Sequence, residues 1–121
     1  MYTIIVETRF QAAHQLDLAG GETEPEHKHD WSVTAEISSD ELSDCGMVAD
    51  FHKIKAKLDK VTDALNGTSL NSLDYFRKLN PAAETVARYI FERLEPELPL
   101  EVTLQSITVG EQIGCWGKFS K

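Results

Sequence analysis

The sequence is poor in cysteine, in positive charge and in long apolar runs. Its two cysteines, Cys45 and Cys115, are too few for a disulfide framework and lack the spacing of a zinc ribbon. Twenty acidic residues against twelve basic ones give a formal net charge of -8, which argues against the clustered positive face that a nucleic-acid partner requires. No apolar run approaches the roughly 18 residues that cross a bilayer. We therefore expect neither a nucleic-acid partner nor a membrane.

The length and composition predict one folded domain over residues 1–121. A chain of 121 residues with 41% hydrophobic content is long enough to bury a single core. Strand-like alternation begins at the second residue, with no charged leader before it, which favours a cytoplasmic location. With nucleic acid and membrane set aside, a small molecule is the expected partner.

Two kinds of periodicity predict an α+β fold with the order β-β-α-α-β-β. Apolar residues recur at spacings of three and four in two helical segments. Asp50 is the expected N-cap of the first helix, whereas the second is expected to begin at Pro81 with Asn80 as its cap. A change of apolar phase predicts a bulge near Ser106. Four stretches alternate as strands do: residues 2–14, 29–39, 101–110 and 113–119.

Three histidines continue the apolar faces of the first two strands. His14 ends the first strand on its apolar face, and His27 and His29 stand two residues apart where the second strand begins. Because residues two apart in a strand point to the same side, the three imidazoles should converge at the strand ends. Backbone hydrogen bonds could account for a lone histidine. Three converging nitrogens instead predict a metal site, most naturally zinc with an open fourth position.

Six short motifs follow one another along almost the whole chain. In order they are Phe10-Gln-Ala-Ala-His14, His27-Lys-His29, Gly46-Met-Val-Ala-Asp50-Phe51, Leu65-Asn-Gly-Thr-Ser-Leu70-Asn71, Asn80-Pro-Ala-Ala-Glu84 and Val109-Gly-Glu111. As a set they resemble the 6-pyruvoyl-tetrahydropterin synthase and 6-carboxy-tetrahydropterin synthase family. The resemblance implies a T-fold, with a four-stranded antiparallel sheet and two helices on one face. It also implies a homo-oligomer, often a hexamer of stacked trimers.

The resemblance assigns roles to four residues of this chain. His14, His27 and His29 match the family's zinc ligands. Glu111 matches the glutamate that anchors the pterin ring, since a carboxylate can accept two hydrogen bonds from the amide and amine edge of the ring.

The positions that handle protons in the family differ here. Thr23 stands at the place of the catalytic cysteine, and Asn66 and Gly67 stand at the places of the catalytic Asp and His. Neither Asn nor Gly can hold or pass a proton at physiological pH. Family members with glutamate at the cysteine position are thought to cleave the pterin side chain. Glu24 and Glu22 flank Thr23 and are the candidate bases, although such an acidic run is also typical of a solvated loop.

These observations predict a zinc-dependent lyase that acts on the side chain of a dihydroneopterin-type pterin. Side-chain cleavage fits the residues better than elimination of triphosphate, because the usual thiol and Asp–His pair are missing. One alternative is a non-catalytic pterin- or purine-binding protein that keeps Glu111 and has lost the chemistry. Another is a zinc-bound structural oligomer, which a Glu111 facing no pocket would favour.

Overall fold

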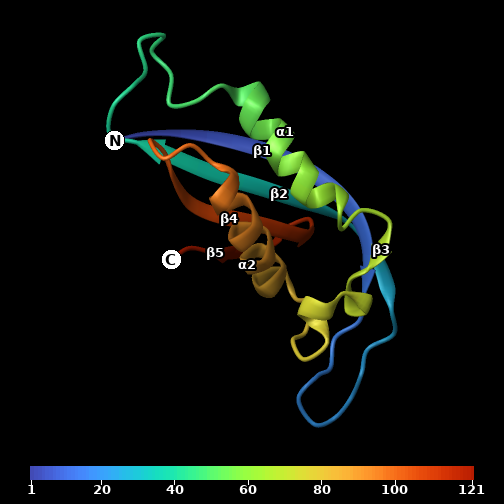
Figure 1. Cartoon of the computed structure of the whole chain (residues 1–121). Helices are drawn as coiled ribbons and strands as arrows, with labels where there is room; N and C mark the ends of the chain where they lie inside the picture. The colour runs from blue at the N-terminus through green and yellow to red at the C-terminus, as the bar shows by residue number, and fades with distance from the viewer.

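Two thirteen-residue strands form the centre of the sheet. The computed structural model describes residues 1–121. Strands β1 (Tyr2–His14) and β2 (His27–Ser39) pair antiparallel along their full length, with Tyr2 opposite Ser39 and His14 opposite His27. Residues directly opposite each other in such a pair point to the same side. The apolar face of β1 therefore coincides with the apolar face of β2, and the loop between them extends beyond the sheet at the end away from the N-terminus (Figure 1).

Three further strands complete a mixed sheet in the order β3-β1-β2-β4-β5. Strands β4 (Thr103–Gln112) and β5 (Cys115–Phe119) extend it antiparallel from β2. Strand β3 (Thr68–Ser69) lies parallel to the end of β1. The predicted four-stranded antiparallel sheet and the order β-β-α-α-β-β were therefore wrong in detail. A strand of two residues is too short to show period-two alternation, so the sequence did not predict β3.

Both helices cover the same face of the sheet (Figure 1). Helix α1 (Phe51–Asp63) packs on β1, and α2 (Ala83–Leu94) packs on β4 and β5. Neither is long and apolar enough to cross a bilayer. Three single 3-10 turns are η1 (Leu70–Ser72), η2 (Asp74–Phe76) and η3 (Glu95–Glu97). The largest fully buried apolar side chains belong to one core cluster: Trp31, Phe91, Ile37, Ile54, Leu58, Leu65, Leu70, Ile90, Leu94 and Ile107.

Of the three predictions of local structure, two are confirmed and one is wrong. Asp50 caps α1 as expected, because its carboxylate accepts a hydrogen bond from the backbone N–H of His52 at 2.8 Å. The bulge near Ser106 is confirmed by a shift in the register between β2 and β4. The start of α2 was wrong: its N-cap is Ala82, and the side chain of Asn80 bonds to a loop instead.

Candidate metal centre

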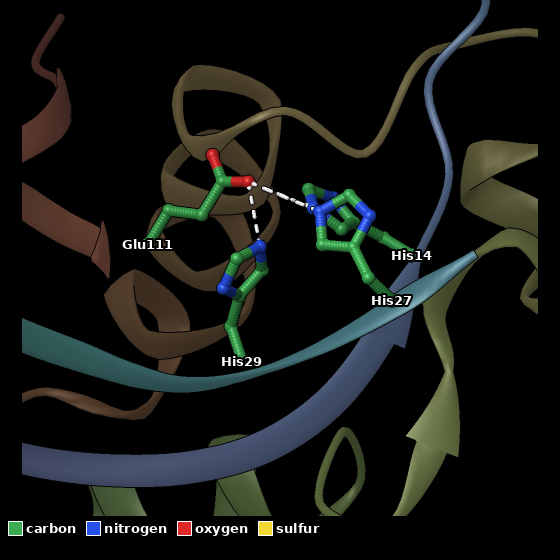
Figure 2. A group of neighbouring side chains, drawn as sticks. All are labelled: His14, His27, His29 and Glu111. Atoms are coloured by element: carbon green, nitrogen blue, oxygen red, sulfur yellow. Dashed lines mark hydrogen bonds and ion pairs between the residues drawn. The ribbon is translucent and has the colours of Figure 1, made fainter. Parts of the chain in front are cut away.

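The pairing of three strands brings four side chains together at one end of the inner face. His14 lies opposite His27, and His29 is the next inner-face residue along β2. On β4 the regular pairing is interrupted after Gly110, and Glu111 lies at this irregularity. Figure 2 shows the three imidazoles rising from β1 and β2, with the Glu111 carboxylate reaching toward them from the opposite side. One ligand atom from each of the four residues lies within 4.8 Å of all the others.

Short distances define the group. The Nε2 atoms of His14 and His27 are 3.0 Å apart. Oε1 of Glu111 lies 2.8 Å from Nε2 of His14, 3.0 Å from Nε2 of His29 and 3.8 Å from Nε2 of His27. The four residues thus form a nitrogen-rich cluster with one carboxylate oxygen near its centre.

Backbone carbonyls fix the tautomers of two of the histidines. Nδ1 of His14 lies 2.8 Å from the carbonyl oxygen of Pro81, and Nδ1 of His27 lies 2.9 Å from that of Pro25. A carbonyl only accepts, so each Nδ1 donates to its carbonyl and each ring turns Nε2 toward the cluster. The two Nε2 atoms lie 3.0 Å apart, and both face Oε1 of Glu111. This donor set fits a metal ion and matches the usual support of metal-bound histidine by a carbonyl.

The chain has two buried side-chain polar atoms without a hydrogen-bond partner, and both are in this region. They are Nε2 of His29 and Oε1 of Glu24. The Glu111 oxygen is 3.0 Å from His29 Nε2, but the contact does not have hydrogen-bond geometry. Burial lowers the pKa of His29, and the neighbouring His27 and His14 lower it further against the opposing effect of Glu111. His29 is therefore neutral at pH 7 and available as a ligand.

Of the three glutamates in the loop between β1 and β2, Glu24 reaches the histidines. Its Oε1 atom lies 3.8 Å from Nε2 of His27. Glu22 is exposed and belongs to no such contact. Glu26 is engaged elsewhere, since its Oε2 accepts a hydrogen bond from the hydroxyl of Ser69 at 2.9 Å. The two candidate bases named from the sequence are thus distinguished by position.

The residues that replace the family's proton-handling side chains contact the backbone or the loop. The Thr23 hydroxyl donates to Oδ1 of Asp17 at 2.9 Å. The Asn66 side chain accepts from the N–H of Gln11 at 2.8 Å, and the N–H of Gly67 donates to the carbonyl of Gln11 at 2.7 Å. None of the three belongs to the histidine cluster.

A concave pocket of about 790 Å³ lies beside Glu111. It is lined mainly by residues of β1, β2 and β4 that point away from the helices, and Trp116 of β5 forms part of its wall. The Glu111 side chain retains 25% of its exposure. Glu111 therefore adjoins both the histidine cluster and a space in the size range of small-molecule sites.

Comparison with known proteins identifies the family. The sequence model described as 6-pyruvoyl tetrahydropterin synthase matches residues 3–121. The chain belongs to this family.

Two curated relatives and one solved structure illustrate the range of similarity. The chain is 37% identical over 100 residues to a 6-carboxy-5,6,7,8-tetrahydropterin synthase of Synechocystis sp., covering 78% of this chain and 76% of the relative. It is 32% identical over 108 residues to a dihydroneopterin monophosphate aldolase of Pyrococcus furiosus, covering 89% and 88%. The structure of Caenorhabditis elegans 6-pyruvoyl tetrahydropterin synthase superposes with a TM-score of 0.84 at 22% identity, covering 99% of this chain and 95% of the other. That match shows the shared T-fold.

Sequence reasoning missed two features of the site. It treated Glu111 as a separate ring anchor, although Ile107, Val109 and Glu111 continue one inner face just as the histidines do. It also missed the carbonyls of Pro25 and Pro81, because backbone acceptors leave no trace in the side-chain pattern. The first omission could have been avoided by extending the period-two count along β4.

The histidine cluster predicts a metal affinity that depends on its members and not on histidine content. Replacement of His29 by alanine should weaken zinc binding by at least about a hundredfold, because one of three nitrogen ligands is lost. The matched control is His52→Ala, an exposed histidine outside the cluster, which should leave the affinity unchanged. Competition with a chromophoric chelator measures both. Equal affinities for the two variants would show that the cluster is not the metal site.

Proposed function

We propose that the protein is a zinc-dependent pterin lyase that cleaves a carbon–carbon bond in the side chain of a dihydroneopterin-type substrate. The observation that carries this proposal is the unpaired, buried oxygen of Glu24 beside the histidine cluster. The relative named dihydroneopterin monophosphate aldolase, which aligns over most of both chains, supports the same chemistry. The relative named 6-carboxy-tetrahydropterin synthase favours a different reaction. Thr23, Asn66 and Gly67 argue against that second reaction, because they replace its expected acid–base groups.

The proposed reaction is a retro-aldol cleavage. The base takes the proton from the hydroxyl on the second side-chain carbon, and that carbon–oxygen bond becomes the carbonyl of a departing aldehyde. The bond between the first and second side-chain carbons breaks, and its electron pair is delocalised into the pterin ring. A proton then returns to the first carbon, which leaves 6-hydroxymethyl-dihydropterin. Atoms and electrons balance without an oxidant or a reductant.

Glu24 is our candidate for the base. A carboxylate oxygen without a hydrogen-bond partner is free to accept a substrate proton, and its place beside His27 puts it where the substrate hydroxyl would approach the cluster. Glu22 is exposed and makes no contact with the cluster, so we no longer favour it.

His14, His27 and His29 are our candidates for holding zinc. Bound there, zinc would supply Lewis-acid polarisation of the side-chain oxygens. The carbonyls of Pro81 and Pro25 keep two of these rings in the tautomer that presents Nε2. The protein thus contributes imidazole nitrogens held in fixed orientations.

Glu111 is our candidate for the ring anchor. One of its oxygens faces the histidines, while its side chain also borders the pocket of about 790 Å³. Turned toward that pocket, the carboxylate would accept two hydrogen bonds from the amide and amine edge of a pterin. The competing role is that of a fourth metal ligand. The short distances from Oε1 of Glu111 to Nε2 of His14 and of His29 support that role.

We also infer from the family that the chain forms a homo-oligomer in the cytoplasm, by resemblance a hexamer of stacked trimers. The sheet order leaves β3 and β5 as edge strands, whose free backbone groups are available for pairing with another copy. Light scattering tests the assembly, and a mass of 13.6 kDa in solution would overturn it.

Product analysis with the zinc-loaded protein tests the activity and the base together. Dihydroneopterin monophosphate and triphosphate should yield 6-hydroxymethyl-dihydropterin, and Glu24→Gln should lower kcat by roughly 10²–10⁴-fold because the base is lost. Glu22→Gln and Glu26→Gln, which make the same change in the same loop, should keep the wild-type rate. Full activity of Glu24→Gln would remove the proposed base. Ring binding without any turnover by the wild type would instead favour a non-catalytic binding protein.

The two roles of Glu111 predict different losses in Glu111→Gln. An anchor role predicts weaker binding of dihydroneopterin by about one to two orders of magnitude with zinc affinity unchanged, because the charged acceptor pair is lost. A ligand role predicts that zinc affinity falls as well. Calorimetric titration of the variant with zinc, and then with the pterin, separates the two. We expect the first result, and unaltered pterin binding would contradict the anchor role.

A further inference from the structure

The loop that carries Glu24 is held in place by side chains at Asp17. The backbone N–H of Asp17 donates to Oδ1 of Asn80 at 2.8 Å, and Nδ2 of Asn80 donates to the carbonyl of Asp17 at 2.7 Å. The Asn80 amide therefore bonds to both backbone polar groups of one loop residue. The Asp17 carboxylate in turn accepts the hydroxyl of Thr23 at 2.9 Å. Asp17 thus links the turn before α2 to the returning arm of the loop.

These bonds decide which way Glu24 points. Asp17 and Thr23 form an isolated antiparallel bridge, and the N–H of Glu24 donates to the carbonyl of Leu16 at 3.0 Å. Successive residues of an extended chain point to opposite sides. The Thr23 hydroxyl faces Asp17, so the next side chain, Glu24, turns the other way and places its Oε1 3.8 Å from His27.

We call Asp17, Thr23 and Asn80 the latch. Two of its members, Thr23 and Asn80, take no direct part in the proposed chemistry. Thr23 stands at the position of the family's catalytic cysteine but bonds within the loop. Asn80 precedes α2 but does not cap it. Loops otherwise move easily, and a mobile Glu24 would spend part of its time hydrated and away from the cluster.

We propose that Thr23 and Asn80 are positioning residues that hold Glu24 against the histidine cluster through Asp17. This inference rests on the proposed function, because it needs Glu24 to act as the base. The inference adds a role for Thr23, which stands at the position of the missing cysteine: it supports the neighbouring Glu24. Neither Thr23 nor Asn80 belongs to the cluster of His14, His27, His29 and Glu111.

The test uses the zinc-loaded full-length protein and near-isosteric variants. Thr23→Val removes the hydroxyl and keeps the shape, and it should lower kcat for dihydroneopterin cleavage on the order of tenfold with KM little changed. Thr23→Ser restores the hydroxyl and should recover most of the rate. Thr3→Val, the same change at an exposed site at the far end of β1, is the matched control and should be silent. Zinc affinity should stay at the wild-type value in all three.

Asn80→Asp provides a second test that does not depend on Thr23. It replaces the donor facing the Asp17 carbonyl with an oxygen, and should lower kcat by a similar factor. A wild-type rate in both Thr23→Val and Asn80→Asp would overturn the proposal, as would a loss that Thr23→Ser does not restore. The proposed function fails separately: in that case Glu24→Gln itself keeps the wild-type rate. An inactive Glu24→Gln beside fully active latch variants would reject the latch alone.

Discussion

The antiparallel pairing of β1 with β2 determines the position of every histidine in the cluster. The same register that puts Phe10 opposite Trp31 in the core puts His14 opposite His27 at its end. A slip by one residue would turn the whole apolar face of a strand toward solvent, so burial of the core enforces this register. The site needs no separate specification. It is the continuation of the hydrophobic face, with imidazoles in place of apolar side chains.

The histidine cluster is less favourable for folding than an apolar surface of the same size would be. Two buried polar atoms without hydrogen-bond partners, beside three imidazoles whose Nε2 atoms face one another, are unfavourable unless a ligand satisfies them. Elsewhere the inner face is apolar and well buried. Buried polar atoms without partners are typical of functional sites when they are concentrated at one place in an otherwise well-packed fold. The same physical feature, buried polar atoms without partners, underlies both the expected metal affinity and the proposed role of Glu24.

Much of this could be predicted from the sequence, and the limits have identifiable causes. Period-two alternation located the histidines, and a capping residue located the start of α1, because both signals are local. Strand β3 has two residues and no periodicity. The choice between Glu24 and Glu22 depends on how an irregular loop folds back, and the contact between Asp17 and Asn80 in that loop spans 63 residues of sequence. The family resemblance identified the positions of the missing acid–base residues. It could not identify which nearby glutamate is the better candidate for the base.

The central claim is that three histidine Nε2 atoms form one metal centre at the strand ends. X-ray absorption fine structure of the zinc-loaded protein measures the ligands directly. Ligation by His14, His27 and His29 predicts a first shell of nitrogen and oxygen at about 2.0–2.1 Å, with the outer-shell scattering of three imidazoles. Scattering from fewer than three imidazoles, or a sulfur shell near about 2.3 Å from Cys45 or Cys115, would contradict it.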